Sequence, residues 1–502
     1  MMGLLFINNF TNIKKQHFMH LKFYKFLLTF SFAVISLFKG YAQSNCNKQS
    51  LWTWGSNFYG EAAYDYVGSS YFTPQHIGNN TNWKQIRAGE TFTVALKKDG
   101  TLWAWGSNAF GQLGDSTYYD KYTPTQIGSS KDWKEIVAGA YHTVALKNDG
   151  SLWAWGRNDY GQLGDGTGIT KNSPTQIGNT KNWEQICAGA YHTFVMTKNG
   201  TMWACGWNGA GAVGDGTGVN KLSLTQIGAD DHWERISGGA YHSIAINKKG
   251  ELMAWGFNIF GQLGDNTTDN KLSPVKIGND TDWEQISAGN AHNLALKKDG
   301  TLWAWGWNNS GQLGDGTNDS KITPTQIGNS IDWKQLSAGT YHNLAIKNDG
   351  SLWAWGWNAI GQLGNDSNYD SNIPLQIGNN TSWSMVSAGY THSTALQCSN
   401  NSQNLENSNS FELNAMDAKA NINVFPNPAS DFLRIDLSEY EGHSVTISLY
   451  NTVGSKVKQV VIDAASSTPH QINVSELAAG SYFVHVQTQG KSNITKNIRI
   501  VR

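Results

Sequence analysis

The chain has 502 residues, which is long enough for more than one domain and for a core that needs no metal to fold. Its 37 Lys and Arg residues nearly balance its 38 Asp and Glu residues, so it lacks the positive field that binding to nucleic acid or anionic lipid requires. The 54 Gly and 22 Trp residues indicate many tight turns and many large rings to bury, which favours short β-strands.

The start of the chain has the pattern of an export signal. Lys22 and Lys25 precede an apolar run over residues 26–38, and residues 40–42 form a small-residue cleavage site. The run lies late for such a signal, so we expect translation to begin at Met19. We therefore expect residues 1–42 to be a signal peptide, with no membrane-spanning segment left after its removal.

A unit of about 50 residues recurs along most of the chain. Its opening element is LWAWG, and copies of this element begin at residues 51, 102, 152, 202, 252, 302 and 352. The segments of one unit lie at residues 102–106, 111–115, 124–128, 133–139 and 142–147. Segments this short, separated by Gly-rich turns, are typical of strands, and we expect four strands in each unit.

The units follow one another through hairpins. Residues 148–150 read Asn-Asp-Gly, and an Asp-Gly turn favours a β-hairpin. Four strands in each of seven units predict a ring of seven small sheets, a seven-bladed β-propeller over residues 43–398. An open ring would expose sheet edges that invite aggregation, so we expect residues 51–54 to pair with residues 392–397.

Four cysteines allow three pairing schemes, and the ring joint favours one of them. The expected strand pairing brings Cys46 and Cys398 to the same end of the joint. We predict a disulfide between them, which an exported protein can form and keep. Cys187 and Cys205 replace a strand residue and a repeat Trp, and we expect them to be buried free thiols with one strand between them.

The repeat ends after Cys398. Residues 399–420 are rich in Asn and Ser, which predicts a flexible linker. Residues 421–502 alternate as strands do, and we expect a small C-terminal β-sandwich there. Its expected strands lie at residues 433–437, 445–450, 457–462, 482–486 and 494–501.

The repeat resembles the unit of the regulator of chromosome condensation (RCC1) family. The matching motifs are WAWG at residues 153–156, NDYGQLG at 158–164, Pro174, and AGAYHT at 188–193. The resemblance implies the propeller fold with high specificity. It implies little about function, because one fold hosts many activities.

The tail resembles the C-terminal sorting domain of the type IX secretion system of Bacteroidetes. The motifs are FPNP at residues 425–428, LYNTVG at 449–454, LAAGSY at 477–482, and a basic end over 496–502. The resemblance implies export across the inner membrane by the signal, and then passage through the outer membrane by contact of the tail with the secretion machinery. The protein is then secreted or lies on the outer cell surface.

Six copies of the repeat carry a histidine at one position: His142, His192, His242, His292, His342 and His392. A ring of imidazoles suggests a metal or proton-transfer cluster, but the geometry of a propeller keeps equivalent positions apart. The first copy has Phe92 there, which cannot be a ligand. We expect structural histidines that hydrogen-bond backbone near the central channel.

A second recurring group is the carboxylates that follow a Gly in a turn, where Asp commonly caps its own backbone: Asp115, Asp165, Asp215, Asp265 and Asp315. Calcium binding is the weaker alternative, and residues 265–269 come nearest to it. The sequence contains no nucleophile elbow, phosphate loop or zinc spacing, so we expect no catalytic residue, no metal site and no cofactor.

The repeat tryptophans and a variable position beside them differ in their expected roles. Trp103 and Trp105 lie two apart on one strand, so we expect them to pack between blades. The residue after the Gly of the opening element is Ser56 or Ser107 in the first two copies, but it becomes large in the other five. We predict a recognition face there, with burial under a neighbouring loop as the alternative. The predicted binding residues are Arg157, Trp207, Phe257, Trp307 and Trp357.

These features favour a non-enzymatic, exported, monomeric binding protein that recognises an extracellular protein or polysaccharide. An inhibitor of an extracellular enzyme is the alternative, because secreted bacterial propellers similar to the family include β-lactamase inhibitors. A carbohydrate-active or peptidoglycan-active enzyme is less favoured, since the sequence reveals no carboxylate pair. Export also disfavours chromatin binding and exchange-factor activity on a small GTPase, so no nucleic-acid partner is expected.

Overall fold

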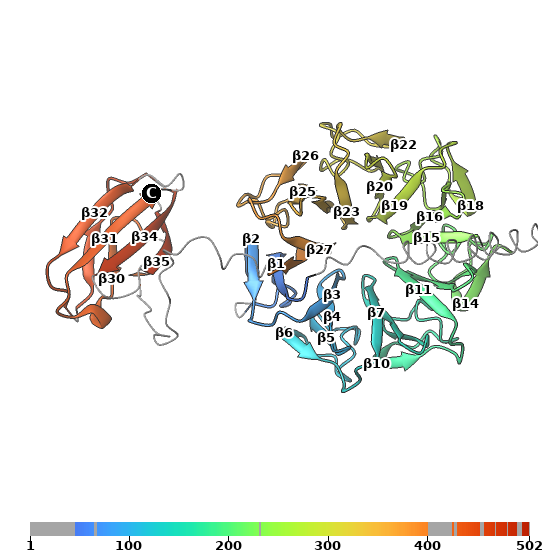
Figure 1. Ribbon diagram of the computed structural model, residues 1–502, viewed down its shortest axis with the longest axis horizontal. Coiled ribbons are helices and arrows are strands. Elements are labelled where there is room, and N and C mark those ends of the chain that lie inside the picture. The colour runs from blue at the N-terminus through green and yellow to red at the C-terminus, as the bar shows by residue number, and fades with distance from the viewer. Residues whose placement is uncertain are drawn as a thin grey trace, which may run out of the picture. The chain divides into compact units, whose positions relative to one another are not determined.

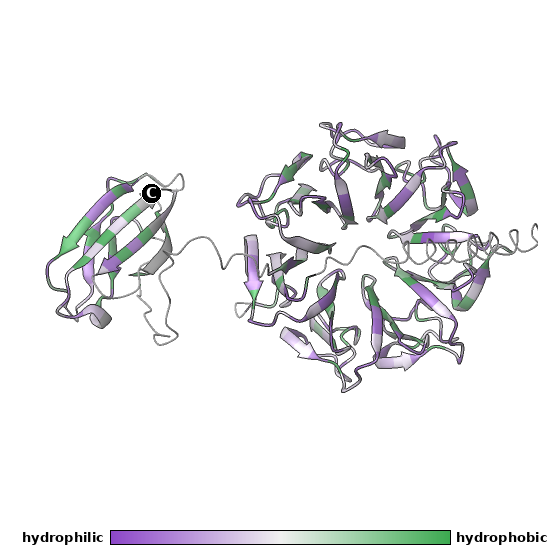
Figure 2. Ribbon diagram, in the orientation of Figure 1, coloured by the Kyte–Doolittle hydropathy of each residue, from purple (hydrophilic) through white to green (hydrophobic). Residues whose placement is uncertain are grey.

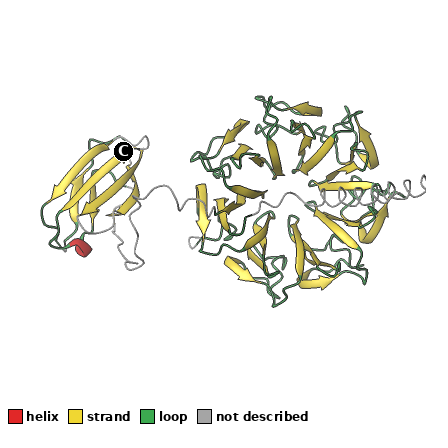
Figure 3. Cartoon of the chain, viewed as in Figure 1, coloured by secondary structure: helices red, strands yellow, loops and turns green. Residues whose placement is uncertain are grey.

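The computed structural model describes residues 46–64, 68–229, 232–399, 424–425, 429–451, 456–466, 468–478, 480–488 and 494–500. The chain divides into two compact units near residue 403. The expected signal peptide and all but the first residue of the expected linker lie outside the described residues. Figure 3 shows strands joined by loops throughout the described chain, with one short helix in the C-terminal unit.

Seven four-stranded antiparallel sheets make up the described part of the first unit, and they surround a central channel (Figure 1). The inner strands are β3 (Trp83–Ala88), β7 (Trp133–Ala138), β11 (Trp183–Ala188), β15 (Trp233–Gly238), β19 (Trp283–Ala288), β23 (Trp333–Ala338) and β27 (Trp383–Ala388). The second strands are β4 (Phe92–Lys97), β8 (His142–Lys147), β12 (His192–Thr197), β16 (His242–Asn247), β20 (His292–Lys297), β24 (His342–Lys347) and β28 (His392–Cys398).

The two outer strands of each blade come from the next copy of the repeat. The third strands are β5 (Leu102–Gly106), β9 (Leu152–Gly156), β13 (Met202–Gly206), β17 (Leu252–Gly256), β21 (Leu302–Gly306), β25 (Leu352–Gly356) and β1 (Gln49–Ser56). The outer strands are β6 (Lys121–Gln126), β10 (Lys171–Gln176), β14 (Lys221–Ile227), β18 (Lys271–Ile277), β22 (Lys321–Gln326), β26 (Ser371–Gln376) and β2 (Ser70–Ile77). Figure 2 shows hydrophilic and hydrophobic residues mixed along these strands, as expected for small sheets with different faces.

The hairpin between the second and third strands fixes where each copy of the repeat enters the next blade. Gly150 has φ +82°, and its N–H donates to the Lys147 carbonyl at 3.0 Å. A residue with a Cβ is strained in this conformation, which explains the Gly that ends each such turn. The expected segment at residues 111–115 is a turn, and the outer strand β6 begins at Lys121, three residues before the expected start.

The first and last strands of the propeller pair with each other, as predicted. Strand β1 runs antiparallel to β28 from the pair Gln49 and Cys398 to the pair Gly55 and His392. Cys46 and Cys398 form the predicted disulfide, with their Cα atoms 5.6 Å apart. The last blade therefore contains strands from both ends of the ring, in the order β2, β1, β28, β27, and the sheet edges at the joint are covered.

Adjacent blades pack through the repeat tryptophans. The buried Trp155 indole donates from Nε1 to the Gln112 carbonyl of the preceding blade at 3.0 Å, and the Thr143 hydroxyl donates to the same carbonyl at 2.8 Å. The Trp133 ring lies 6.0 Å from Trp155 in a tilted contact. Burial of each large ring stabilises the seam by about 2–3 kcal/mol relative to exposure.

The remaining cysteines lie in one blade and face its two different neighbours, with Cys205 beside the preceding blade and Cys187 beside the next. Strand β12 separates Cys187 on β11 from Cys205 on β13, as expected. Cys205 takes the place of the repeat Trp and is fully buried. Cys187 is half-buried rather than buried, and its Sγ accepts the N–H of Gly238 from the next blade at 3.2 Å.

The six repeat histidines are structural, but their partners differ from the prediction. His142 Nε2 lies 2.9 Å from the Thr193 hydroxyl, a side chain of the next blade and not backbone. His242 Nε2 lies 2.8 Å from Asn293 Oδ1, which only accepts, so Nε2 carries the proton. The backbone beside these imidazoles already bonds within the blade, as the Gly139 N–H does to the His142 carbonyl. The imidazole Nε2 therefore bonds to the side chain that faces it from the next blade.

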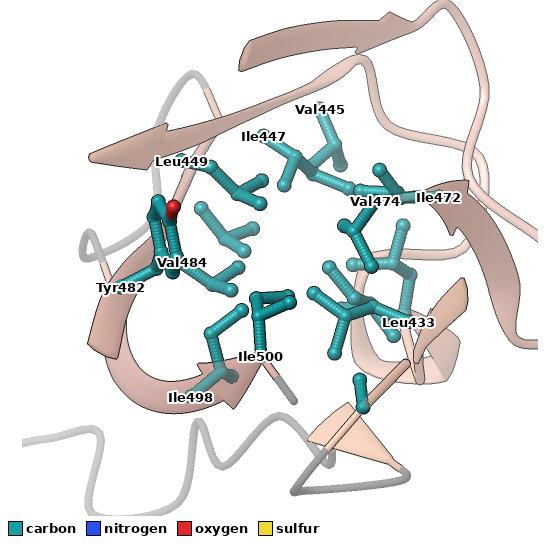
Figure 4. Packing of buried hydrophobic residues seen from close by; sticks show 14 of the residues in the cluster. Leu433, Val445, Ile447, Leu449, Ile472, Val474, Tyr482, Val484, Ile498 and Ile500 are labelled. Atoms are coloured by element: carbon teal, nitrogen blue, oxygen red, sulfur yellow. The ribbon is translucent and has the colours of Figure 1, made fainter. Parts of the chain in front are cut away.

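The second unit is a sandwich of two sheets. Strands β29 (Val424–Phe425), β30 (Phe432–Ile435) and β33 (His470–Asn473) form one sheet; β32 (Lys456–Ile462), β31 (Val445–Asn451), β34 (Gly480–Thr488) and β35 (Ile494–Ile500) form the other. Figure 4 shows Leu433 and Ile472 of the first sheet facing Ile447 and Val484 of the second across one core. The sequence did not predict β29, β33 or the 3₁₀ helix η1 (Ser438–Tyr440), which are too short for a clear periodicity.

Loss of the disulfide should destabilise the propeller. The bond joins residues separated by 352 positions, so it restricts the unfolded chain strongly. We expect Cys46→Ser to lower the free energy of unfolding by about 2–4 kcal/mol, measured by urea denaturation. Cys187→Ser is the matched control and should be nearly neutral, because Ser237 and Ser287 occupy the equivalent position and their hydroxyls accept the same kind of N–H.

Mass analysis after alkylation without reduction checks the same joint. The parent should show one disulfide and two free thiols, at Cys187 and Cys205. Alkylation of Cys46 in the folded parent would contradict the covalent closure.

The buried histidines should make the propeller sensitive to acid. Burial lowers the pKa of His142 from 6.5 to about 3, and that of His242 to about 4. Below pH 6.5 the unfolded chain therefore binds protons that the folded chain does not, so stability falls as the pH drops toward 4 and does not depend on these groups above 6.5. Each histidine should contribute roughly 1–2 kcal/mol to the loss between about pH 7.5 and about pH 5.

His142→Phe isolates one of these contributions. Phe92 stands at the equivalent position of the first copy. Thr143, the residue opposite Phe92 in the next blade, donates to the Gln112 carbonyl without an imidazole partner. The variant should show a smaller loss of stability between the two pH values in urea denaturation. An unchanged pH dependence would contradict the assignment.

Candidate functional site

One end of the central channel forms a cavity of about 360 Å³, which we call the mouth. It is lined by the loops that join each inner strand to the second strand. In each loop an Ala or Gly ends the inner strand and a Gly follows it, so the floor of the mouth carries little side-chain bulk. The larger lining residues are Glu90, Tyr191, Tyr241, Asn290, Thr340, Tyr341 and Tyr390.

Backbone hydrogen bonds between blades hold the mouth loops in a ring. The N–H of Glu90 donates to the Ala140 carbonyl at 3.3 Å, and the N–H of Ala140 donates to the Ala190 carbonyl at 3.2 Å. On the other side of the ring joint, the N–H of Tyr390 donates to the Glu90 carbonyl at 3.3 Å. These bonds fix the loops before any ligand arrives, which reduces the entropy lost on binding.

Four tyrosines line the mouth, and we call them the inner ring: Tyr191, Tyr241, Tyr341 and Tyr390. Tyr191 and Tyr241 stack with their ring centroids 5.4 Å apart. Burial raises the pKa of Tyr191 to about 12, so its hydroxyl stays protonated and can donate. The sequence analysis missed this ring, although Tyr precedes His in several copies of the AGAYH motif.

The predicted binding residues lie around the inner ring, and we call them the outer ring: Arg157, Trp207, Phe257, Trp307 and Trp357. All five are half-buried, whereas Ser56 and Ser107 at the equivalent positions are buried. The centroid of Trp207 lies 4.7 Å from that of Tyr241, and the centroid of Trp307 lies 5.2 Å from that of Tyr341. These side chains therefore pack against a neighbour and keep an exposed portion, and the recognition face stays a prediction.

Arg157 is the one member of the outer ring that is not aromatic, and its guanidinium packs against neighbouring aromatic rings. The group lies 5.0 Å from the ring centroid of Phe110 and 5.8 Å from that of Tyr141. It also pairs with Asp159 at 2.8 Å. Such a guanidinium adds a flat, polar face to the arc and contributes cation–π attraction.

Glu90 is the one carboxylate among the described residues that line the mouth. Burial raises its pKa, while a hydrogen bond from the Tyr141 hydroxyl and the charge of Arg157 oppose that rise. The carboxyl group is thus partly desolvated and already has one partner. It can still bond to a ligand hydroxyl in either protonation state.

The repeat carboxylates have structural partners. Asp115 accepts the N–H of Thr117 at 3.0 Å, as expected for an Asp that caps its own turn, and it pairs with Lys121 at 2.9 Å. The same ion pair recurs from Asp165 to Lys171 and in three further copies. Within the described ranges, no group of three or more His, Cys, Asp and Glu side chains is placed to bind a metal.

Close approach between blades explains the Gly in six of the seven mouth loops and gives a test of the ring. A Cβ on Gly239 would lie 2.7 Å from the Gly289 carbonyl oxygen and would also clash with the His242 imidazole. We expect Gly239→Ala to lower the free energy of unfolding by about 1–3 kcal/mol in urea denaturation. Gly168→Ala is the control: its Cβ would be 3.8 Å from the nearest atom, so a similar loss there would contradict the explanation.

Family models match both units. The RCC1-like domain model matches residues 218–395, and the regulator of chromosome condensation (RCC1) repeat matches residues 99–146 and 149–196, with a second model of that repeat at 83–112, 133–162 and 183–212. The secretion system C-terminal sorting domain matches residues 423–501. No helix among the described residues is long and apolar enough to cross a membrane.

Known proteins are similar to the propeller. A human protein described as the probable E3 ubiquitin-protein ligase HERC6 is 33% identical over 83 residues, which are 16% of this chain and 8% of that protein. Human WBSCR16 superposes with a TM-score of 0.63 at 22% identity, over 70% of this chain and 99% of that one. Prp20p of Saccharomyces cerevisiae superposes with a TM-score of 0.64 at 22% identity, over 71% of this chain and 93% of that one. At these identities the two structures establish a shared fold.

Proposed function

We propose that this chain, an RCC1-repeat β-propeller that carries a type IX secretion system sorting domain, is a non-enzymatic binding protein whose mouth face recognises an extracellular partner. The sorting domain indicates export to the cell surface or the extracellular space, which sets where the partner must be. The observation that carries the proposal is the arc of half-buried aromatic residues around a mouth whose loops are fixed by backbone hydrogen bonds.

The arc has the composition that binding surfaces favour. Aromatic and Arg side chains contribute most of the binding energy at interfaces, and rigid presentation lowers the entropic cost of association. Trp307, Tyr341 and Trp357 contact one another in sequence, with centroids 5.2 and 5.8 Å apart. A partner can therefore bury a continuous apolar surface there without first ordering the side chains.

Two other functions have weaker support. Inhibition of an extracellular enzyme would use the same face, and Prp20p, described by its binding to Gsp1p and histones, gives a precedent for protein binding by this fold. A glycan-cleaving or peptidoglycan-cleaving enzyme generally needs two carboxyl groups beside the bond to be cleaved. Glu90 is the one carboxyl group among the described lining residues, and nearby Asp159 is paired with Arg157.

A capture experiment tests the proposal. The full chain, immobilised, should retain a partner from surface proteins and polysaccharides of the native habitat. The fourfold variant Trp207→Ala, Phe257→Ala, Trp307→Ala and Trp357→Ala should bind that partner at least about tenfold more weakly, because one central hot-spot residue contributes about 2 kcal/mol.

The control for capture replaces four exposed residues of the peripheral loops by Ser: Tyr119, Ile169, Val219 and Tyr369, which are 64–80% exposed. This variant should keep the partner. Equal loss in both variants would mean that general surface hydrophobicity causes capture, and retention by the outer-ring variant would contradict the assigned face.

A further inference from the structure

Building on the proposed function, we infer that the mouth binds the end of a neutral carbohydrate chain, with a terminal sugar against the inner ring and Glu90 and the following sugars against the outer ring. A sugar ring offers an apolar C–H face and a rim of hydroxyls, so its site needs flat aromatic surfaces beside hydrogen-bonding groups.

The mouth supplies both kinds of surface. The rings of Tyr241, Tyr341 and Tyr390 line the cavity, and Tyr341 contacts Tyr390 with centroids 5.7 Å apart. Polar side chains lie among them, because Asn290 and Thr340 also line the cavity. The lining as a whole exposes more polar than apolar surface, which suits a ligand rich in hydroxyls.

The size of the cavity favours a chain end over a folded domain. Its volume of about 360 Å³ is at the small end of the range of about 300–1,000 Å³ that ligand pockets span. The Ala and Gly residues of the loops leave this space open, and their Cβ positions are restricted by the adjacent blade. A folded partner could touch the rim but could not fill the mouth.

The charge of the mouth favours a neutral ligand. An anionic chain would bring a second negative charge beside Glu90, the one carboxylate among the described lining residues. A cationic ligand would compete with Arg157, whose charge already acts on Glu90, and with the Tyr141 hydroxyl that is bonded to it. A hydroxyl needs no charge and can donate to or accept from the carboxyl group.

The outer ring extends the same surface outward. Trp207 packs on Tyr241, and both Trp307 and Trp357 pack on Tyr341, so the two rings are in contact. A chain that leaves the mouth meets these half-buried indoles next. The positions equivalent to the outer ring are the buried Ser56 and Ser107 in the other two copies. A bound carbohydrate chain would therefore leave the mouth over the outer ring and not over these serines.

Titration calorimetry on the full chain tests the ligand class with five probes. They are malto-, cello- and manno-oligosaccharides, which are neutral, polygalacturonate, which is anionic, and oligolysine, which is cationic. We expect at least one neutral oligosaccharide to bind. Tyr341→Ala and Tyr390→Ala should each weaken it at least about tenfold, the loss expected for one stacked aromatic residue.

Glu90→Gln tests whether ligand binding depends on a negative charge at Glu90. Gln keeps hydrogen-bonding capacity without charge, so binding of the neutral oligosaccharide should change by less than about threefold. Tyr119→Ser is the control for general surface effects and should leave binding unchanged. Thermal unfolding of each variant should match the parent, and the two independent tyrosine variants guard against loss of binding through misfolding.

The outcomes distinguish this inference from the proposed function. Binding of only polygalacturonate or oligolysine, of no probe, or of a neutral probe that both tyrosine variants bind normally overturns the inference. Capture of a protein partner through the outer ring would then leave the binding function standing. If the capture experiment also retains nothing, the proposed function fails as well.

Discussion

The structure depends on closure of the ring of blades, because every blade must contact two neighbours and leave no free sheet edge. The pairing of β1 with β28 and the disulfide from Cys46 to Cys398 meet this requirement at the joint. Elsewhere the same seam recurs: the Gln112 carbonyl accepts from both Trp155 and Thr143 of the next blade. A carbonyl with two donors from one neighbour fixes both the distance and the tilt between blades.

The mouth is a consequence of that geometry. In six of the seven mouth loops, closure brings the Gly so near to a carbonyl of the next blade that a side chain cannot be accommodated. Small residues therefore line the floor, and the space they leave becomes the cavity. The inner-ring tyrosines then line it, close in sequence to histidines such as His242, whose partner Asn293 belongs to the next blade. Interactions that stabilise the ring thus also fix the candidate site.

The sorting domain and the propeller differ in what their residues specify. The sorting domain has its own core, in which the two sheets meet through residues such as Ile447 and Ile472, and it indicates the route of export. The propeller carries the variable positions. Its histidines and repeat indoles bond to the neighbouring blade, as Trp255 does to the Ala212 carbonyl, whereas the position of Trp207 holds Ser, Arg, Trp or Phe in different copies.

The sequence by itself determined the all-β class and the blades, because strand periodicity, Asp-Gly turns and the repeat are local signals. It also predicted the strand pairing at the joint and its disulfide, because a closed ring leaves the first and last strands to pair with each other. It also identified the outer ring, since its variation stands out against a fixed repeat. Only the tertiary structure decided that Glu90 and the tyrosines share a mouth, that Trp307 and Trp357 are half-exposed, and that histidines bond to side chains. These facts depend on the distance and tilt between blades, which all seven sheets set together when the ring closes and which no single repeat encodes.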